Sequence, residues 1–205
     1  METHSYLTIE RNAEAEFKDR GSRFLAFAFP VSTPEAVKER LQSVRKEHPK
    51  ASHHCFAYRL GTEGLLFRVS DAGEPSGTAG KPILGQIDRR GLTDVLVTVV
   101  RYFGGTLLGV PGLIQAYRSA AALALQLTPA VRKQIEETCE LQFDYTTLNQ
   151  VLQTVRQYRC SIQQQELQLF CSLRIGIPVN KLQDCLKDLK GIPNLEIAFR
   201  LKEGV

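Results

Sequence analysis

Two glycine-rich loops separate the predicted strands and helices in the first part of the sequence. The first spans residues 70–82 (SDAGEPSGTAGKP) and the second spans residues 101–112 (RYFGGTLLGVPG). Each is rich in polar residues and runs into a predicted helix. Ordering such loops costs conformational entropy without filling a core. We therefore expect them to approach a ligand, and their composition favours an anion or an RNA backbone.

The first part of the chain is predicted to form a sheet with helices. Residues 94–102 (DVLVTVVRY) are apolar enough for a central strand. Thr33 followed by Pro34 is typical of the start of a helix, and this helix is expected to bury Val37, Leu41 and Val44. The predicted strands are residues 14–18, 22–31, 53–60, 65–71 and 94–102, and the predicted helices are residues 33–47, 82–90 and 112–127.

The last part of the chain has a clearer order. Alternating and helical apolar spacings predict strands at residues 137–145, 160–165, 167–177 and 195–201, and helices at residues 147–158 and 180–189, the second capped by Asn180. This β-α-β-β-α-β order is that of a ferredoxin-like domain, with two helices on one face of an antiparallel sheet. We therefore predict an α+β protein with a first domain over residues 1–130, a linker over 131–136 and a second domain over 137–205.

Composition restricts the class of protein. The chain has 205 residues, of which 43% are hydrophobic, which is typical of a folded protein. No apolar run reaches the roughly 18–20 residues that span a bilayer, and the start lacks the apolar core of a signal peptide. The five cysteines form no CxxC pair, so we interpret them as reduced thiols. These features predict a cytoplasmic protein.

Segments around both loops resemble the bacterial branch of the IMPACT/YigZ family. The resemblance covers roughly residues 15–125 and is carried by VSDAGEPSGTAGKPIL, VVRYFGGTLLGVPGLIQAY, GSRFLA at residues 21–26 and ASHHCFAYR at residues 51–59. It implies a first domain like the β-α-β fold of a small-subunit ribosomal protein and of elongation factor G domain IV. It implies a second domain like domain V of that factor. Eukaryotic members are implicated in translational control, and nucleic-acid or ribosome binding is the usual suggestion for bacterial members.

The second loop has the strand–loop–helix order that aims backbone N–H groups at an anion. It lacks the Lys-Ser/Thr ending of a phosphate-binding P-loop, which disfavours nucleotide hydrolysis. Pro111 and Gln115 depart from the family pattern and remove a donor and a charge. The alternative is that the glycines only make tight turns. The candidate anion or nucleic-acid contacts are Arg101, Gly104, Gly105, Gly109, Gly112, Lys81 and Arg118.

The first loop and the strand before it hold a candidate polar cluster. On a strand, His53 and Cys55 face one side and His54 faces the other, which disfavours a shared metal. The cluster either orders a ligand or bonds only to itself, with Asp71 accepting N–H bonds and Lys81 pairing with Glu74. No catalytic residue, metal or cofactor is assigned. The cluster consists of His53, Asp71, Glu74, Ser76 and Thr78.

The charge distribution bears on the partner. Residues 1–134 carry 18 Lys and Arg against 13 Asp and Glu, whereas residues 135–205 carry 8 against 9. The leading hypothesis is a non-enzymatic, translation-linked protein whose first domain binds RNA, the ribosome or a translation-factor partner. A rival is an enzyme that acts on a small anionic substrate with Asp71, Glu74, Lys81 and His53. A third is a protein-interaction module with exposed Leu107, Leu108 and Val110.

Overall fold

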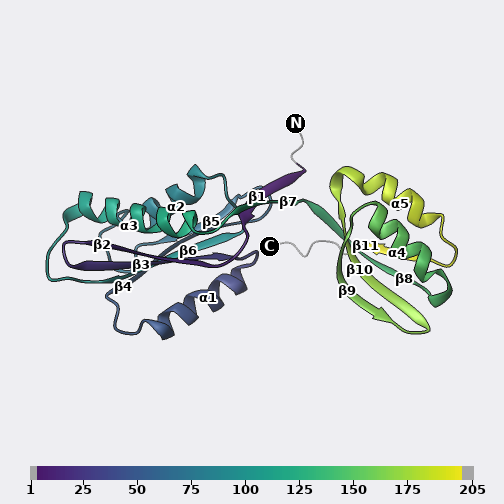
Figure 1. Cartoon of the computed structure of the whole chain (residues 1–205), viewed down its shortest axis with the longest axis horizontal. Helices are drawn as coiled ribbons and strands as arrows, with labels where there is room; N and C mark the ends of the chain where they lie inside the picture. The colour runs from purple at the N-terminus through teal and green to yellow at the C-terminus, as the bar shows by residue number, and fades with distance from the viewer. Residues whose placement is uncertain (1–3, 200–205) are drawn as a thin grey trace. The chain divides into compact units, whose positions relative to one another are not determined.

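The computed structural model describes residues 4–199 and divides them into two compact units. Residues 6–133 form the first unit, and residues 134–199 with residues 4–5 form the second. Both units mix helices with sheet (Figure 1), so the chain is an α+β protein as the sequence predicts. Among the helices of residues 4–199, none combines the length and the apolarity that a bilayer crossing requires.

The first unit is built on a five-stranded sheet in the order β2-β3-β6-β4-β5, with every neighbouring pair antiparallel. The central position of β6 is confirmed, because its side chains are buried from Val95 to Arg101. A strand covered on both faces reads as a continuous apolar run, which this segment does. The strands are β2 (Ala13–Asp19), β3 (Ser22–Pro30), β4 (His53–Leu60), β5 (Leu66–Ser70) and β6 (Val95–Tyr102).

Three helices cover the two faces of this sheet (Figure 1). Helix α1 (Pro34–Glu47) lies on one face and begins as expected, since the Thr33 side chain accepts a hydrogen bond from the Ala36 N–H. Helices α2 (Gly80–Arg89) and α3 (Gly109–Gln126) lie on the other face. Both begin earlier than the sequence indicates. Pro111 does not delay α3, because the first turn of a helix needs no N–H at that position.

A small two-stranded sheet joins β1 (Ser5–Ile9) to β7 (Ala130–Gln134). Residues 131–136, which the sequence assigns to a linker, therefore contain most of β7 and the first residue of β8. The sequence gives little warning of this pairing, because β7 (AVRKQ) is short and almost fully exposed.

The second unit has the predicted β-α-β-β-α-β order, with its sheet arranged β11-β8-β10-β9. Both helices lie on the same face of the sheet (Figure 1), and the core between them holds Leu141 and Leu173 from the sheet and Leu189 from α5. Asn180 lies in a 3₁₀ turn before α5 instead of capping it. The last predicted strand is described to Phe199, and residues 200–201 lie outside the described part. The elements are β8 (Glu136–Asp144), α4 (Leu148–Gln157), β9 (Ser161–Leu167), β10 (Phe170–Pro178), α5 (Leu182–Lys190) and β11 (Glu196–Phe199).

Candidate functional site

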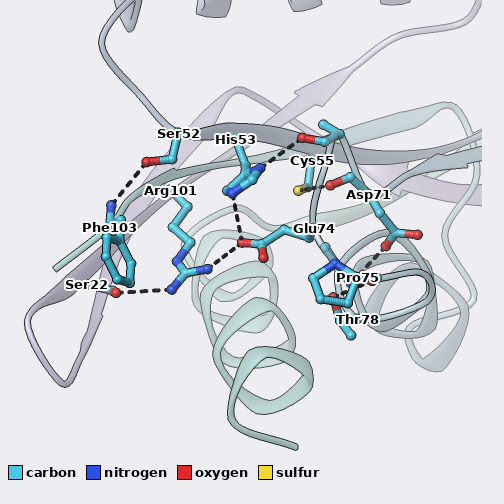
Figure 2. A network of polar contacts seen from close by, with 12 residues as sticks. Ser22, Ser52, His53, Cys55, Asp71, Glu74, Pro75, Thr78, Arg101 and Phe103 are labelled. Atoms are coloured by element: carbon cyan, nitrogen blue, oxygen red, sulfur yellow. Dashed lines mark hydrogen bonds and ion pairs between the residues drawn. The ribbon is translucent and has the colours of Figure 1, made fainter. Parts of the chain in front are cut away.

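The two glycine-rich loops meet at a buried carboxylate, that of Glu74. Its Oε1 accepts hydrogen bonds from Arg101 Nη1 at 2.7 Å and from the Tyr117 hydroxyl at 2.8 Å. Glu74 belongs to the first loop, Arg101 lies at the end of β6 where the second loop begins, and Tyr117 lies on α3. The Glu74 and Arg101 side chains are only 3% and 6% exposed. This buried ion pair therefore fastens one loop to the other (Figure 2).

The guanidinium of Arg101 is enclosed by aromatic rings. Its central carbon lies 5.5 Å from the ring centres of both Phe24 and Phe103. Nη2 is 3.4 Å from the Ser22 hydroxyl oxygen, on the side away from Glu74 (Figure 2). Nε is buried without a hydrogen-bond partner among the described residues. A bound anion would have to compete with Glu74 for this charge, so the proposed anion contact at Arg101 stays a prediction.

His53 and Cys55 do face one side of β4, toward the first loop. His53 Nδ1 lies 2.9 Å from the Ala72 carbonyl oxygen, which only accepts, so this nitrogen carries the proton. His53 Nε2 lies 3.8 Å from Glu74 Oε1. The Cys55 thiol donates to the Asp71 carbonyl oxygen at 3.0 Å, and burial raises its pKa to about 12. A thiol with that pKa is a poor nucleophile at neutral pH.

Asp71 holds the start of α2 together. Its Oδ1 accepts from the N–H groups of Ala79 and Gly80, at 2.9 and 2.8 Å, and its Oδ2 accepts from the Gly77 N–H at 2.8 Å. Burial raises the pKa of the Asp71 carboxyl, but the amide hydrogen bonds outweigh it, with help from the Lys81 charge, and hold that pKa below its ordinary value. The amides that would cradle an external anion are therefore already bound to a carboxylate of the chain itself.

The other polar residues of the first loop do not converge on Glu74. The Thr78 hydroxyl donates to the Pro75 carbonyl oxygen at 2.6 Å, and Ser76 is exposed. Lys81 is also exposed, and among the described residues the cation that pairs with Glu74 is Arg101. The pairing of Lys81 with Glu74, which belonged to the self-bonded alternative, is therefore wrong: the end of β6 brings a different cation to the carboxylate.

Close backbone contacts account for several glycines of the second loop. A Cβ on Gly104 would lie 1.9 Å from the carbonyl carbon of Gly21, so the loop rests directly on the β2–β3 turn. Gly105 and Gly109 have φ values of +85° and +70°, which side chains rarely adopt. A Cβ on Gly112 would lie 3.0 Å from the Leu108 Cβ. This geometry agrees with the tight-turn interpretation of these glycines.

The second loop exposes apolar side chains, which we call the apolar loop surface: Phe103, Leu107 and Val110. Their exposed fractions are 49%, 82% and 52%, whereas Leu108 is buried at 7%. Arg118, on the helix that follows, is also exposed. The loop therefore presents three large apolar side chains to solvent, each of them about half exposed or more.

Sequence reasoning missed the role of Tyr117. The structure buries Tyr117 completely, between the sheet and α3, with its ring edge-on to Phe24. The signal was present, because Leu113, Ala116 and Ala120 share its face of α3 at helical spacing.

Comparison with known proteins places the region around the two loops in a known family. A model of the Impact N-terminal domain matches residues 20–125, which include both loops and every residue of the buried network. The chain belongs to the IMPACT family. It is 37% identical over 165 residues to the IMPACT family member YigZ of Escherichia coli, covering 80% of this chain and 81% of that protein. An IMPACT family member of Haemophilus influenzae is 35% identical over 200 residues, which is 97% of each chain.

The likeness extends to a solved structure. The crystal structure of a hypothetical protein superposes with a TM-score of 0.74 and 32% identity, covering 98% of this chain and 100% of the other. That likeness covers both units of this chain.

Proposed function

We propose that this protein is a non-catalytic, cytoplasmic accessory or regulatory protein of translation. Its first unit would bind RNA, the ribosome or a translation factor through the second loop. Family membership supports the link to translation. The β-α-β-β-α-β order of the second unit supports a ferredoxin-like domain, and the resemblance supports a ribosomal-protein-like first domain. Fold alone fixes no function, so the argument rests on the loops.

The observation that carries the proposal is that the loops use their carboxylates and Arg101 internally while exposing apolar side chains. Glu74 is paired with Arg101 and hydrogen-bonded to Tyr117, and Asp71 caps α2. The rival hypothesis of an enzyme requires Asp71, Glu74, Lys81 and His53 to converge on a substrate. Instead, Asp71 faces the start of α2, and Glu74 has almost no exposed surface. A catalytic acid or base has to reach the proton that it transfers.

The exposed side of the second loop suits a macromolecular partner. Large apolar side chains supply binding energy when a partner buries them, and exposed Lys81 and Arg118 add attraction to acidic or phosphate groups. Exposure of Leu107 and Val110 specifically favours a protein surface over a bare phosphate backbone. Among the proposed partners, the exposed apolar side chains therefore favour protein components of the translation machinery.

Binding of the full chain to purified ribosomes, measured by co-sedimentation across a salt series, tests the proposal. We expect Leu107→Ser to weaken binding at least about fivefold, which corresponds to roughly 1 kcal/mol. Leu65→Ser is the matched control, because Leu65 is 76% exposed and lies outside both loops. If phosphates contribute, Lys81→Ala or Arg118→Ala lowers the slope of log affinity against log salt by about 1. Absence of ribosome binding at low salt refutes the ribosome as the partner, and binding that none of these variants changes refutes the proposed contact surface.

A further inference from the structure

Two thiols of the second unit face each other. Cys160 Sγ, just after α4, lies 3.8 Å from Cys185 Sγ on α5. Both cysteines are free, Cys185 is fully buried and Cys160 is partly exposed. A disulfide has a sulfur–sulfur distance of about 2.05 Å, so the two atoms need to close by less than about 2 Å. The sequence alone gave no sign that these two cysteines lie close together, and we interpreted them only as reduced thiols.

The surrounding contacts hold the two cysteines in place. Arg159, with φ of +56°, ends α4 in a left-handed turn, and the Cys160 N–H donates to the Val155 carbonyl oxygen at 2.9 Å. The Tyr158 hydroxyl donates to Asp188 Oδ2 at 2.7 Å, one turn of α5 beyond Cys185. The end of α4 and the middle of α5 are therefore tied together close to the two cysteines.

The two thiols differ in reactivity. The hydrogen bond between the two thiols outweighs partial burial and lowers the pKa of Cys160, and the positive charge of Lys181 acts in the same direction. The same hydrogen bond, together with burial, raises the pKa of Cys185, which keeps its proton. Cys160 is thus both the more accessible sulfur and the one that more readily becomes a thiolate, which is the nucleophilic form. Burial raises the pKa of nearby Cys139 to about 11, which disfavours it as a competitor.

We propose that Cys160 and Cys185 are a reversible disulfide-forming site whose oxidant is a low-molecular-weight disulfide. The Cys160 thiolate attacks one sulfur of the small disulfide, breaks its S–S bond and releases one thiolate. The released thiolate takes the proton of Cys185. Cys185 Sγ then attacks Cys160 Sγ and expels the second small thiolate, which takes a proton from water. Two protein thiols are oxidised, and one small disulfide is reduced to two thiols. This proposal is independent of the partner of the first unit.

The test equilibrates the full chain in glutathione buffers of increasing oxidised fraction, quenches with acid and alkylates the remaining thiols. Digestion after basic residues leaves Cys160 and Cys171 in one peptide, so a second cleavage after Glu166 is needed to separate them. We expect a cross-linked pair of peptides containing Cys160 and Cys185, lighter by two hydrogen atoms than the reduced peptides. Dithiothreitol should reverse it completely.

Substitutions of single cysteines identify the two sulfur atoms that form the cross-link. Cys160→Ser should abolish the cross-link, and Cys171→Ser, the matched control in the same unit, should retain it in full. In Cys185→Ala, glutathione should accumulate on Cys160, because no second thiol expels it. If that buried substitution prevents folding, the Cys160→Ser result and the peptide map of the unaltered chain still show whether Cys160 and Cys185 are joined. A stable glutathione adduct on unaltered Cys160 at every ratio, a link from Cys160 to Cys139, or no oxidation of Cys185 overturns the proposal.

Discussion

Replacing Arg101 with methionine removes the charge that neutralises Glu74 while keeping a long side chain between the two phenylalanine rings. The Glu74 and Arg101 side chains are 3% and 6% exposed, so the remaining carboxylate would stay buried without its counter-ion. Removing one partner of a buried ion pair costs about 3–5 kcal/mol. Total stabilities of about 5–15 kcal/mol are typical, so this loss would leave the first unit close to unfolding.

The chain supplies a matched control for this experiment. Arg174 Nη2 and Glu140 Oε1 in the second unit are also 2.7 Å apart, but their side chains are 30% and 27% exposed. A pair of that exposure contributes about 0–1 kcal/mol, so Arg174→Met should have a small effect. The two substitutions are chemically identical, and the two pairs have the same separation. The largest difference between the two pairs is burial, so the difference between the two losses reports chiefly on desolvation.

The coupling between the partners is measured by a double-mutant cycle. Glu74→Gln keeps an oxygen that accepts from Tyr117 but leaves Arg101 without a counter-ion. We expect Arg101→Met with Glu74→Gln to cost at least about 1 kcal/mol less than the sum of the single changes. The assay is hydrogen exchange under increasing urea, read peptide by peptide, because it reports on each unit separately. A loss below about 1 kcal/mol for Arg101→Met, or additive effects in the cycle, refutes the reasoning.

Further predictions concern the loop backbone. Asp71→Asn should cost about 1–3 kcal/mol at pH 7, because hydrogen bonds from amides to a charged carboxylate are lost. Since the folded-state pKa of Asp71 lies below its ordinary value, the unaltered chain should lose this contribution as pH falls below about 4, and the variant should show a flatter urea-midpoint profile from pH 7 to 3. Gly104→Ala should cost about 3 kcal/mol or more in thermal melts, since its Cβ would overlap the Gly21 backbone. Gly85→Ala, whose Cβ meets nothing within 4 Å inside α2, should instead stabilise by about 0.5–1 kcal/mol.

Local signals predicted most of the fold because they act over a few residues. The Thr33 cap, the apolar run of β6 and the alternation in the second unit each depend on neighbours in the sequence. Pairing between segments that are distant in the sequence was harder to predict. The short polar strand β7 pairs with β1 far along the chain, and its own residues carry no apolar pattern that indicates a strand.

The candidate site was only partly predictable, for a physical reason. The sequence identified Glu74 and Arg101 as important, but the one partner that it offered Glu74 was Lys81, and it assigned Arg101 to an external anion. Which cation reaches a buried carboxylate depends on where β6 and α3 cross the first loop, and this is a property of the tertiary structure. The same holds for Leu107 and Leu108. Adjacent leucines in a loop look alike in sequence, yet one is 82% exposed and the other 7%.

The buried ion pair and the apolar loop surface belong to one argument about binding. A flexible loop loses conformational entropy when a partner immobilises it, and that loss weakens binding. Here Glu74 and Arg101 fix the loop before any partner arrives, and Gly104 rests on Gly21. The charges therefore act by holding Leu107 and its neighbours in a fixed arrangement. On this reasoning, Arg101→Met weakens partner binding together with loop protection in hydrogen exchange, whereas Leu107→Ser weakens binding and leaves protection unchanged. Equal loss of protection in both variants would contradict it.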